Sequence, residues 1–166
     1  MRKLALLCLI LTIGTASLLA GGFITANDLE PASLTGAADY DGVQILATAE
    51  KNVTIEDLGD SVRESADGEV FNSRIKLNGS GKPEYRAIRF TSDTDGATLV
   101  VYLNSSSKTD ARTLIVARPD GSQVTTLTAP PDSSDEAGIA SCVLPEAGEY
   151  LVYSKSSGIN IYMLYC

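Results

Sequence analysis

From Val43 to the C-terminus the chain is divided into short strand-like runs, and this division limits the possible fold more than any other feature. Several runs alternate between apolar and polar side chains, as in 98–103, where leucine or valine occupies every second position. Turn sequences rich in glycine, proline, asparagine and aspartate separate the runs. No segment after residue 26 carries a convincing apolar stripe of helical period. The sequence therefore predicts an all-β fold, an antiparallel β-sandwich of the jelly-roll or immunoglobulin-like kind.

The predicted strands share a length and spacing that suit two packed sheets. They are 43–49, 51–56, 70–77, 86–90, 98–103, 113–117, 124–127, 139–144, 150–154 and 159–165. The total of 166 residues is about one domain's worth, so we expect a single domain over 42–166.

The first 26 residues have the order of a secretory signal peptide. Arg2 and Lys3 precede a nearly unbroken apolar run, which small residues follow. Cleavage after Ala26 fits this order, and cleavage after Ala20 is the alternative. Because 4–26 is uncharged and long enough to span a bilayer, an uncleaved membrane anchor is the competing interpretation. We expect a secreted or cell-surface protein that meets a membrane only through an uncleaved signal.

Residues 27–41 are rich in small and acidic side chains without a clear period, so we interpret them as a leader or linker.

Charge is unevenly distributed after the predicted signal peptide. Eleven acidic and two basic residues fall in 27–70, whereas eight basic and four acidic residues fall in 71–118. An acidic protein with a locally basic middle indicates a specific partner for that part of the chain.

Composition excludes several classes of function. The chain has no histidine, which removes any histidine-dependent triad, imidazole base or histidine metal site. Its net charge of −8 makes nucleic acid a poor partner, because the phosphate backbone would repel it. No pair of carboxylates is singled out for glycosidase chemistry. We therefore expect no catalytic activity, no cofactor and no metal; the oligomeric state is left open.

Two cysteines follow the predicted signal peptide, Cys142 and Cys166. In an exported chain an even pair of cysteines favours a disulfide, and the two residues lie on nearby predicted strands. A Cys142–Cys166 bridge is the candidate, although alternation alone cannot show that the two β-carbons meet.

Several short motifs occur in an order that resembles a known family. They are LNGSG (77–81), YRAIRF (85–90), VYLNSSS (101–107), ARTL (111–114) and SSGINIY (156–162). Together they resemble the β-sandwich modules appended to bacterial pectate lyases, including the pectin-binding carbohydrate-binding module family 77. The resemblance covers roughly 51–166. It implies a non-catalytic domain that binds acidic, pectin-like polysaccharide through basic side chains on one sheet face.

The resemblance also implies a set of ligand-binding residues. Arg89 is the second basic residue of the YRAIRF strand, and Lys155 directly precedes the SSGIN motif. Asn104 stands where family members often have lysine, and Lys108 could replace that charge from the far end of the loop. The remaining two candidates are Arg112, at the family's arginine before the central strand, and Tyr162, as a sugar-facing ring.

Each candidate also has a structural interpretation. Arg112 could form a salt bridge to a turn aspartate, and Arg89 and Lys155 could belong to an ordinary solvated strand face. The alternative function is a structural or protein-interaction β-sandwich of the cell surface that has lost the sugar site. The departure at Asn104 and the acidic charge favour that alternative.

Overall fold

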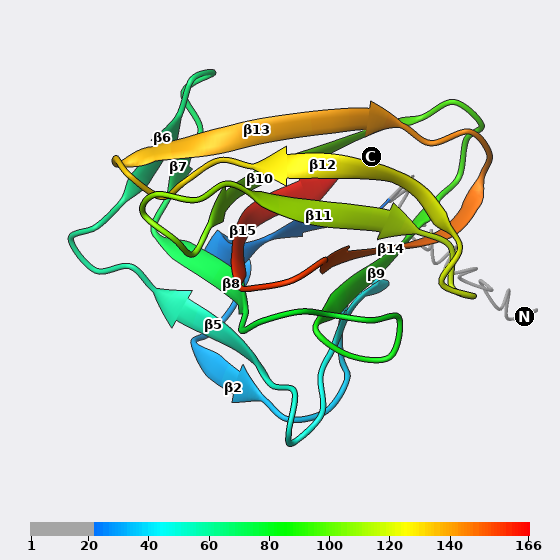
Figure 1. Ribbon diagram of the computed structural model, residues 1–166, viewed down its shortest axis with the longest axis horizontal. Coiled ribbons are helices and arrows are strands. Elements are labelled where there is room, and N and C mark those ends of the chain that lie inside the picture. Colours follow the sequence, from blue (N-terminus) through cyan, green and yellow to red (C-terminus); the bar gives the residue numbers. More distant parts are fainter. Residues whose placement is uncertain (1–21) are drawn as a thin grey trace, which may run out of the picture.

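The computed structural model describes residues 22–166, in which two β-sheets face each other with apolar side chains between them (Figure 1). The larger sheet, sheet A, contains β1 (Phe23–Thr25), β2 (Ala32–Leu34), β5 (Val53–Asp57), β6 (Arg63–Ser65), β7 (Val70–Phe71), β8 (Ser73–Leu77), β10 (Thr98–Ser105), β13 (Glu136–Val143) and β15 (Ile159–Tyr165). The smaller sheet, sheet B, contains β3 (Ala38–Tyr40), β4 (Val43–Leu46), β9 (Ala87–Ser92), β11 (Arg112–Ala117), β12 (Gln123–Ala129) and β14 (Gly148–Ser154).

The neighbouring strands are antiparallel throughout, except where β6 pairs with β13 in parallel. Strands β9 to β15 cross repeatedly from one sheet to the other, so residues distant in sequence share each sheet. The order in sheet A is β2-β5-β8-β15-β10-β13-β6-β7, with β1 also paired to β15, and the order in sheet B is β12-β11-β14-β9-β4-β3. Within 22–166 the helical structure is one 3-10 turn, η1 (Ala26–Asp28). The predicted all-β sandwich is confirmed.

The core follows from the alternation read in the sequence. Leu99, Val101 and Leu103 of β10 are each fully buried between the sheets. Ile88 and Phe90 of β9 face them from sheet B, which turns the intervening Arg89 outward. Nine of the ten predicted strands are present, with bounds that differ by a few residues, whereas the predicted strand 70–77 is divided into β7 and β8, which pair with different strands.

The N-terminal part of the domain corrects our prediction. The interval 27–41 is not a linker, because β2 pairs with β5 and β3 pairs with β4. Most of the predicted signal peptide, 1–21, lies outside the described residues. Its last residues, however, form β1, where Ile24 is 3% exposed, and the start of η1, where Ala26 is fully buried. The folded domain therefore begins well before residue 42. The sequence hides these strands because they are only three residues long and acidic at the edges.

The hairpin of β6 and β7 forms the edge of sheet A next to β13, at one end of the sandwich (Figure 1). It folds back over the outer face of β10 and β15. Its Phe71 packs against Tyr102 and Tyr162, with ring centroids 5.3 and 5.4 Å apart. The Tyr102 hydroxyl donates a hydrogen bond of 2.7 Å to the carboxylate of Asp67 in the hairpin turn. These contacts form a second apolar cluster outside the main core.

The expected disulfide is absent from the structure, which leaves Cys142 and Cys166 free. Cys142 pairs with Leu99 on β10, and Cys166 follows β15 on the other side of β10. One intervening strand separates the two by roughly 9–10 Å, beyond the reach of about 7 Å that a disulfide allows. Burial raises the pKa of both thiols.

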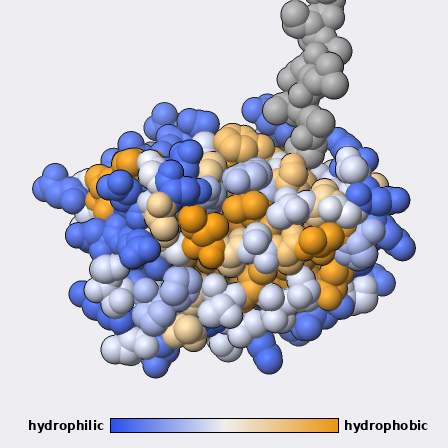
Figure 2. Space-filling view, turned by 90° about the horizontal axis from the view of Figure 1, so that it is seen from above, coloured by the Kyte–Doolittle hydropathy of each residue, from blue (hydrophilic) through white to orange (hydrophobic). Residues whose placement is uncertain are grey.

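An apolar patch covers part of the face seen from above in Figure 2, between hydrophilic margins. Strand β13 runs along this side of the molecule, and its outward Ile139 and Val143 are 42% and 62% exposed. Over 22–166, no helix has the length and apolar character needed to cross a bilayer.

Candidate functional site

Arg89 stands on the outer face of sheet B, in the middle of that sheet. Its strand, β9, is paired on both sides, so that Gln44 of β4 and Leu151 of β14 lie directly across from it. The neighbouring apolar side chains of this face form a small buried cluster, which includes Leu151 and Tyr153. Arg89 itself is half-buried on this face.

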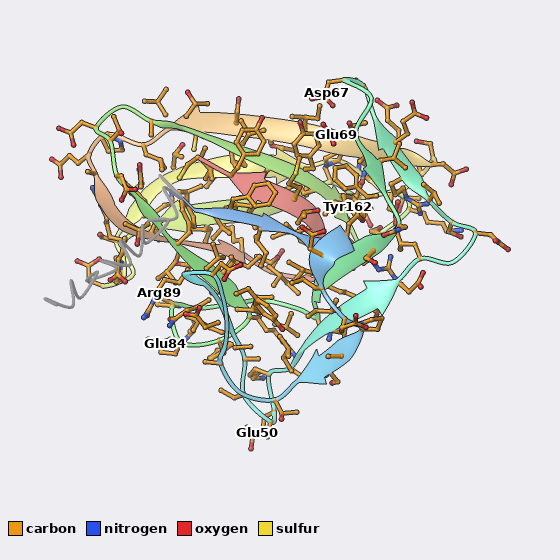
Figure 3. The ribbon with its side chains drawn as sticks, turned by 180° about the vertical axis from the view of Figure 1, so that it is seen from behind. Glu50, Asp67, Glu69, Glu84, Arg89 and Tyr162 are labelled. Carbon is orange, nitrogen blue, oxygen red and sulfur yellow. The ribbon has the colours of Figure 1, made fainter. Side chains whose placement is uncertain are left out.

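The guanidinium of Arg89 differs from those of the other arginines in 22–166. Its Nε is buried and has no hydrogen-bond partner among the described residues. In that part of the chain, no ion pair joins Arg89 to an acidic side chain, although Figure 3 shows Glu84 on the same side of the molecule. By contrast, Arg63, Arg74 and Arg118 each form an ion pair. Arg86 and Arg112 form none within 22–166, but their guanidinium groups donate hydrogen bonds to other residues. Arg89 is therefore a cation whose counter-charge is left to a ligand or to solvent.

Lys155 follows the last residue of β14 and is exposed. Its backbone N–H donates to Thr113 on β11, so it lies at the end of sheet B. It is four residues from Leu151, the partner of Arg89, a separation of roughly 13 Å along the strand. Arg89 and Lys155 thus belong to the same sheet but do not touch a common point.

Lys108 and Arg112 lie near the same end of sheet B as Lys155, whose N–H donates to the residue that follows Arg112. Lys108 is exposed in the loop 106–111, whose shape is held by a hydrogen bond of 2.9 Å from Ser107 to Asp110. Arg112, at the start of β11, donates from Nη1 to the Ser106 hydroxyl at 2.6 Å and to the carbonyl of Gly158. The Arg112 side chain therefore ties two turns together, and the expected bridge to a turn aspartate is replaced by these two bonds.

Asn104 and Tyr162 lie on sheet A, on the opposite face of the molecule from Arg89. Tyr162 of β15 is fully buried beneath the β6–β7 hairpin, stacked on Phe71 (Figure 3). Burial, with the nearby Asp132 carboxylate, raises the pKa of Tyr162 to about 12. The prediction of Tyr162 as a sugar-facing ring is wrong, because a hairpin distant in sequence covers it.

Asn104 of β10 is 2% exposed, which also departs from the surface position expected for it. It nevertheless lines an open cavity of about 220 Å³. Its Nδ2 donates to the carbonyl of Pro131 at 3.4 Å, and its Oδ1 has no partner among the described residues. Asn160 lies directly opposite Asn104 on β15, and its Oδ1 also has no hydrogen-bond partner among the described residues. The sequence analysis did not identify Asn160 as a candidate. A polar residue inside the apolar run 159–165 is the signal that could have revealed it.

The six predicted residues therefore do not form one site. Arg89 lies in the middle of sheet B, Lys155, Lys108 and Arg112 lie near one end of that sheet, and Asn104 and Tyr162 lie on sheet A. A further cavity of about 320 Å³ is lined by β1, η1 and the β3–β4 turn, in residues that the sequence assigned to signal and linker. Within 22–166, no group of three or more cysteine, aspartate or glutamate side chains is arranged to hold a metal ion.

Comparisons with known proteins find structural similarities at low sequence identity. No family model matches the chain, and no curated protein matches it. Among solved structures, CsCBM6-3 from Clostridium stercorarium in complex with cellobiose is 15% identical, with 87% of this chain and 92% of that one covered and a TM-score of 0.40. A family 6 carbohydrate-binding module from Clostridium cellulolyticum in complex with xylose is 9% identical, with coverages of 89% and 98% and a TM-score of 0.41. The catalytic unit of an α-1,3-glucanase from Streptomyces thermodiastaticus is 10% identical, with coverages of 89% and 26% and a TM-score of 0.45.

Proposed function

We propose that this chain is a non-catalytic carbohydrate-binding β-sandwich that takes an acidic, pectin-like polysaccharide at Arg89. The observation that carries the proposal is the unpaired guanidinium of Arg89, with a buried Nε that has no partner in 22–166. A partly desolvated cation without a counter-charge is costly, and a ligand carboxylate removes that cost. Arginine also matches a carboxylate in geometry, because two of its N–H groups can donate to the two oxygens.

The charge of the whole molecule supports this assignment. The chain carries a net charge of −8, so an unpaired arginine stands out among many available acids. Lys155 supplies a second positive charge on the same sheet, at a distance that a polymer with repeated carboxylates can bridge. The sugar backbone then lies along sheet B, with Arg89 as the stronger contact and Lys155 as an exposed, solvated one.

Export is part of the same proposal. Arg2 and Lys3, followed by an apolar run and small residues, have the order of a secretory signal. A module that binds a plant cell-wall polymer has to work outside the cell, on the cell surface or free.

A structural or protein-interaction role is the second candidate. The burial of Asn104 and Tyr162 favours it, because two of the six predicted ligand contacts are removed from solvent. The exposed Ile139 and Val143 on β13 are side chains of the kind that a protein partner could cover.

Retention of the purified protein on low-ester pectin, measured by affinity electrophoresis, tests the first candidate. We expect Arg89→Ala to weaken binding about tenfold or more, because a charge-assisted pair is lost. Arg89→Lys keeps the charge, so its affinity for pectin should lie between those of the unsubstituted protein and Arg89→Ala. Lys51→Ala is the matched control, since it removes one positive charge from the exposed turn between β4 and β5. Added salt should weaken the binding. Retention that changes neither with Arg89→Ala nor with added salt would contradict the proposal and leave the structural or protein-interaction role.

A further inference from the structure

The cavity beside Asn104 lies on the other side of the sandwich from Arg89. It opens where the end of β10 meets the segment between β12 and β13, and its volume is about 220 Å³. Pro130 and Pro131 form one wall, and Ser133, Ser134 and Glu136 stand at the rim.

The base of the cavity holds an amide whose orientation is fixed. Asn104 Nδ2 donates to the Pro131 carbonyl at 3.4 Å. Turning the amide would place its oxygen against that carbonyl, so Oδ1 is the atom left without a partner. On the next strand, Asn160 Nδ2 donates to Asp132 at 3.5 Å, and its Oδ1 is also without a partner among the described residues.

These two acceptors are an unusual feature of a folded interior. Asn104 is 2% exposed and Asn160 is fully buried, and buried amide oxygens nearly always accept a hydrogen bond. Each oxygen can be satisfied only by a group that donates. Since Asn104 lines the cavity, the cavity is the side from which a donor would approach its amide.

The charges around the cavity decide what kind of donor fits. Glu136 lies at its rim, and Asp132 and Asp135 lie in the same segment. Arg63, the cation of this region, is already held by Asp132 at 3.0 Å and Asp135 at 3.2 Å. An anionic ligand would therefore meet carboxylates without a free counter-charge. A hydroxyl group meets no such penalty, because it can donate to Asn104 and accept from a serine.

We propose that this cavity is a second binding site, for one neutral, hydroxyl-bearing sugar ring. Asn104 Oδ1 accepts a ligand hydroxyl at the base, Ser133 and Ser134 contact hydroxyls at the rim, and the proline wall faces the C–H edge of the ring. The volume lies below the range of about 300–1,000 Å³ that is usual for larger ligands, which suits a single ring or chain end. The site requires neither Arg89 nor an acidic ligand.

Titration of the folded protein with glucose, galactose and xylose, followed by amide NMR, tests this site. We expect millimolar dissociation constants, with shifts concentrated on the Asn104 side-chain amide and on Ser134 and Gly138. Galacturonate should bind at least tenfold more weakly here, because of the surrounding carboxylates.

Two variants make the test specific. Asn104→Leu should abolish the shifts without lowering the urea midpoint, because an apolar side chain replaces a partly satisfied amide. Ser133→Ala, at the exposed rim, should weaken binding severalfold in a protein that is folded as before. Arg89→Ala is the matched control and should leave sugar binding in the cavity unchanged. A failure of the cavity proposal can therefore be distinguished from a failure of the pectin proposal. Absence of shifts with all three neutral sugars, shifts with a primary amine alone, or unchanged sugar binding by Asn104→Leu would each overturn the proposal.

Discussion

Strand β1 allows the sharpest test of where the folded domain begins. Ile24 is 3% exposed within the main core, whereas the adjacent Phe23 is 47% exposed on the outer face. Replacing a buried isoleucine by alanine costs about 2–5 kcal/mol. Because β1 pairs only with β15, its surroundings can partly close the space, and we expect the lower part of that range, about 2–3 kcal/mol, for Ile24→Ala. Phe23→Ala is the control and should cost about 1 kcal/mol.

A chain that starts at Asn27 extends the same argument. It also loses the burial of Ala26 and two backbone hydrogen bonds, from Gly22 N–H to Thr91 and from Cys166 N–H to the Gly22 carbonyl. With about 0.5–1.5 kcal/mol for each bond, added to about 2–3 kcal/mol for Ile24, the total loss is about 3–6 kcal/mol. That is a large share of the roughly 5–15 kcal/mol that stabilises a domain.

Urea unfolding of chains that start at Gly22 and at Asn27 measures this loss directly. The urea midpoint of Ile24→Ala should be lower than that of Phe23→Ala, and the two variants should have the same m-value. Equal stability of the two chains, or equal cost of the two substitutions, would refute the inclusion of β1 in the core. The same comparison measures what each cleavage position would cost the fold, since cleavage after Ala26 would remove β1 and cleavage after Ala20 would retain it.

Three further predictions follow from single features of the fold. Gly81→Ala should cost about 1–3 kcal/mol in thermal or urea unfolding, because the added carbon would meet a backbone carbonyl, while Gly36→Ala, with nothing within 4 Å, should change stability by less than about 0.5 kcal/mol. Hydrogen bonds from a serine hydroxyl and then a tyrosine hydroxyl lower the pKa of Asp67. This carboxylate therefore stabilises the fold at pH values above its unfolded pKa of about 4, and the contribution is lost as the pH falls through the lower pKa of the folded state. When the free energy of unfolding is measured against pH, Asp67→Asn should reduce the loss of stability at acid pH. Cys142 and Cys166 should both titrate as free thiols in the unfolded, unreduced protein, and a mass that rises by two hydrogens on reduction would contradict this.

Much of the fold could be predicted because strand formation leaves a local signature. Alternation placed Leu99 inward and Arg89 outward, and both positions are confirmed. The short edge strands left no such signature, since a three-residue strand such as β2 or β3 is stabilised by the longer strand beside it.

The candidate sites could be predicted only in part. Lys155 and Lys108 are exposed, as their turn sequences suggested, but exposure does not establish a common site. Two of the other candidates, Asn104 and Tyr162, came from motifs that carry no information on what covers them.

The amino-acid sequence by itself determined that the chain forms strands, where most of them run, and which side of each strand is apolar, because these properties depend on residues two positions apart. The tertiary structure alone decided which strands are neighbours and which outer faces stay open. The β6–β7 hairpin, from residues 63–71, buries Tyr162, and an intervening strand separates Cys142 from Cys166. Such outcomes depend on contacts between segments far apart in the chain, for which a local pattern holds no record.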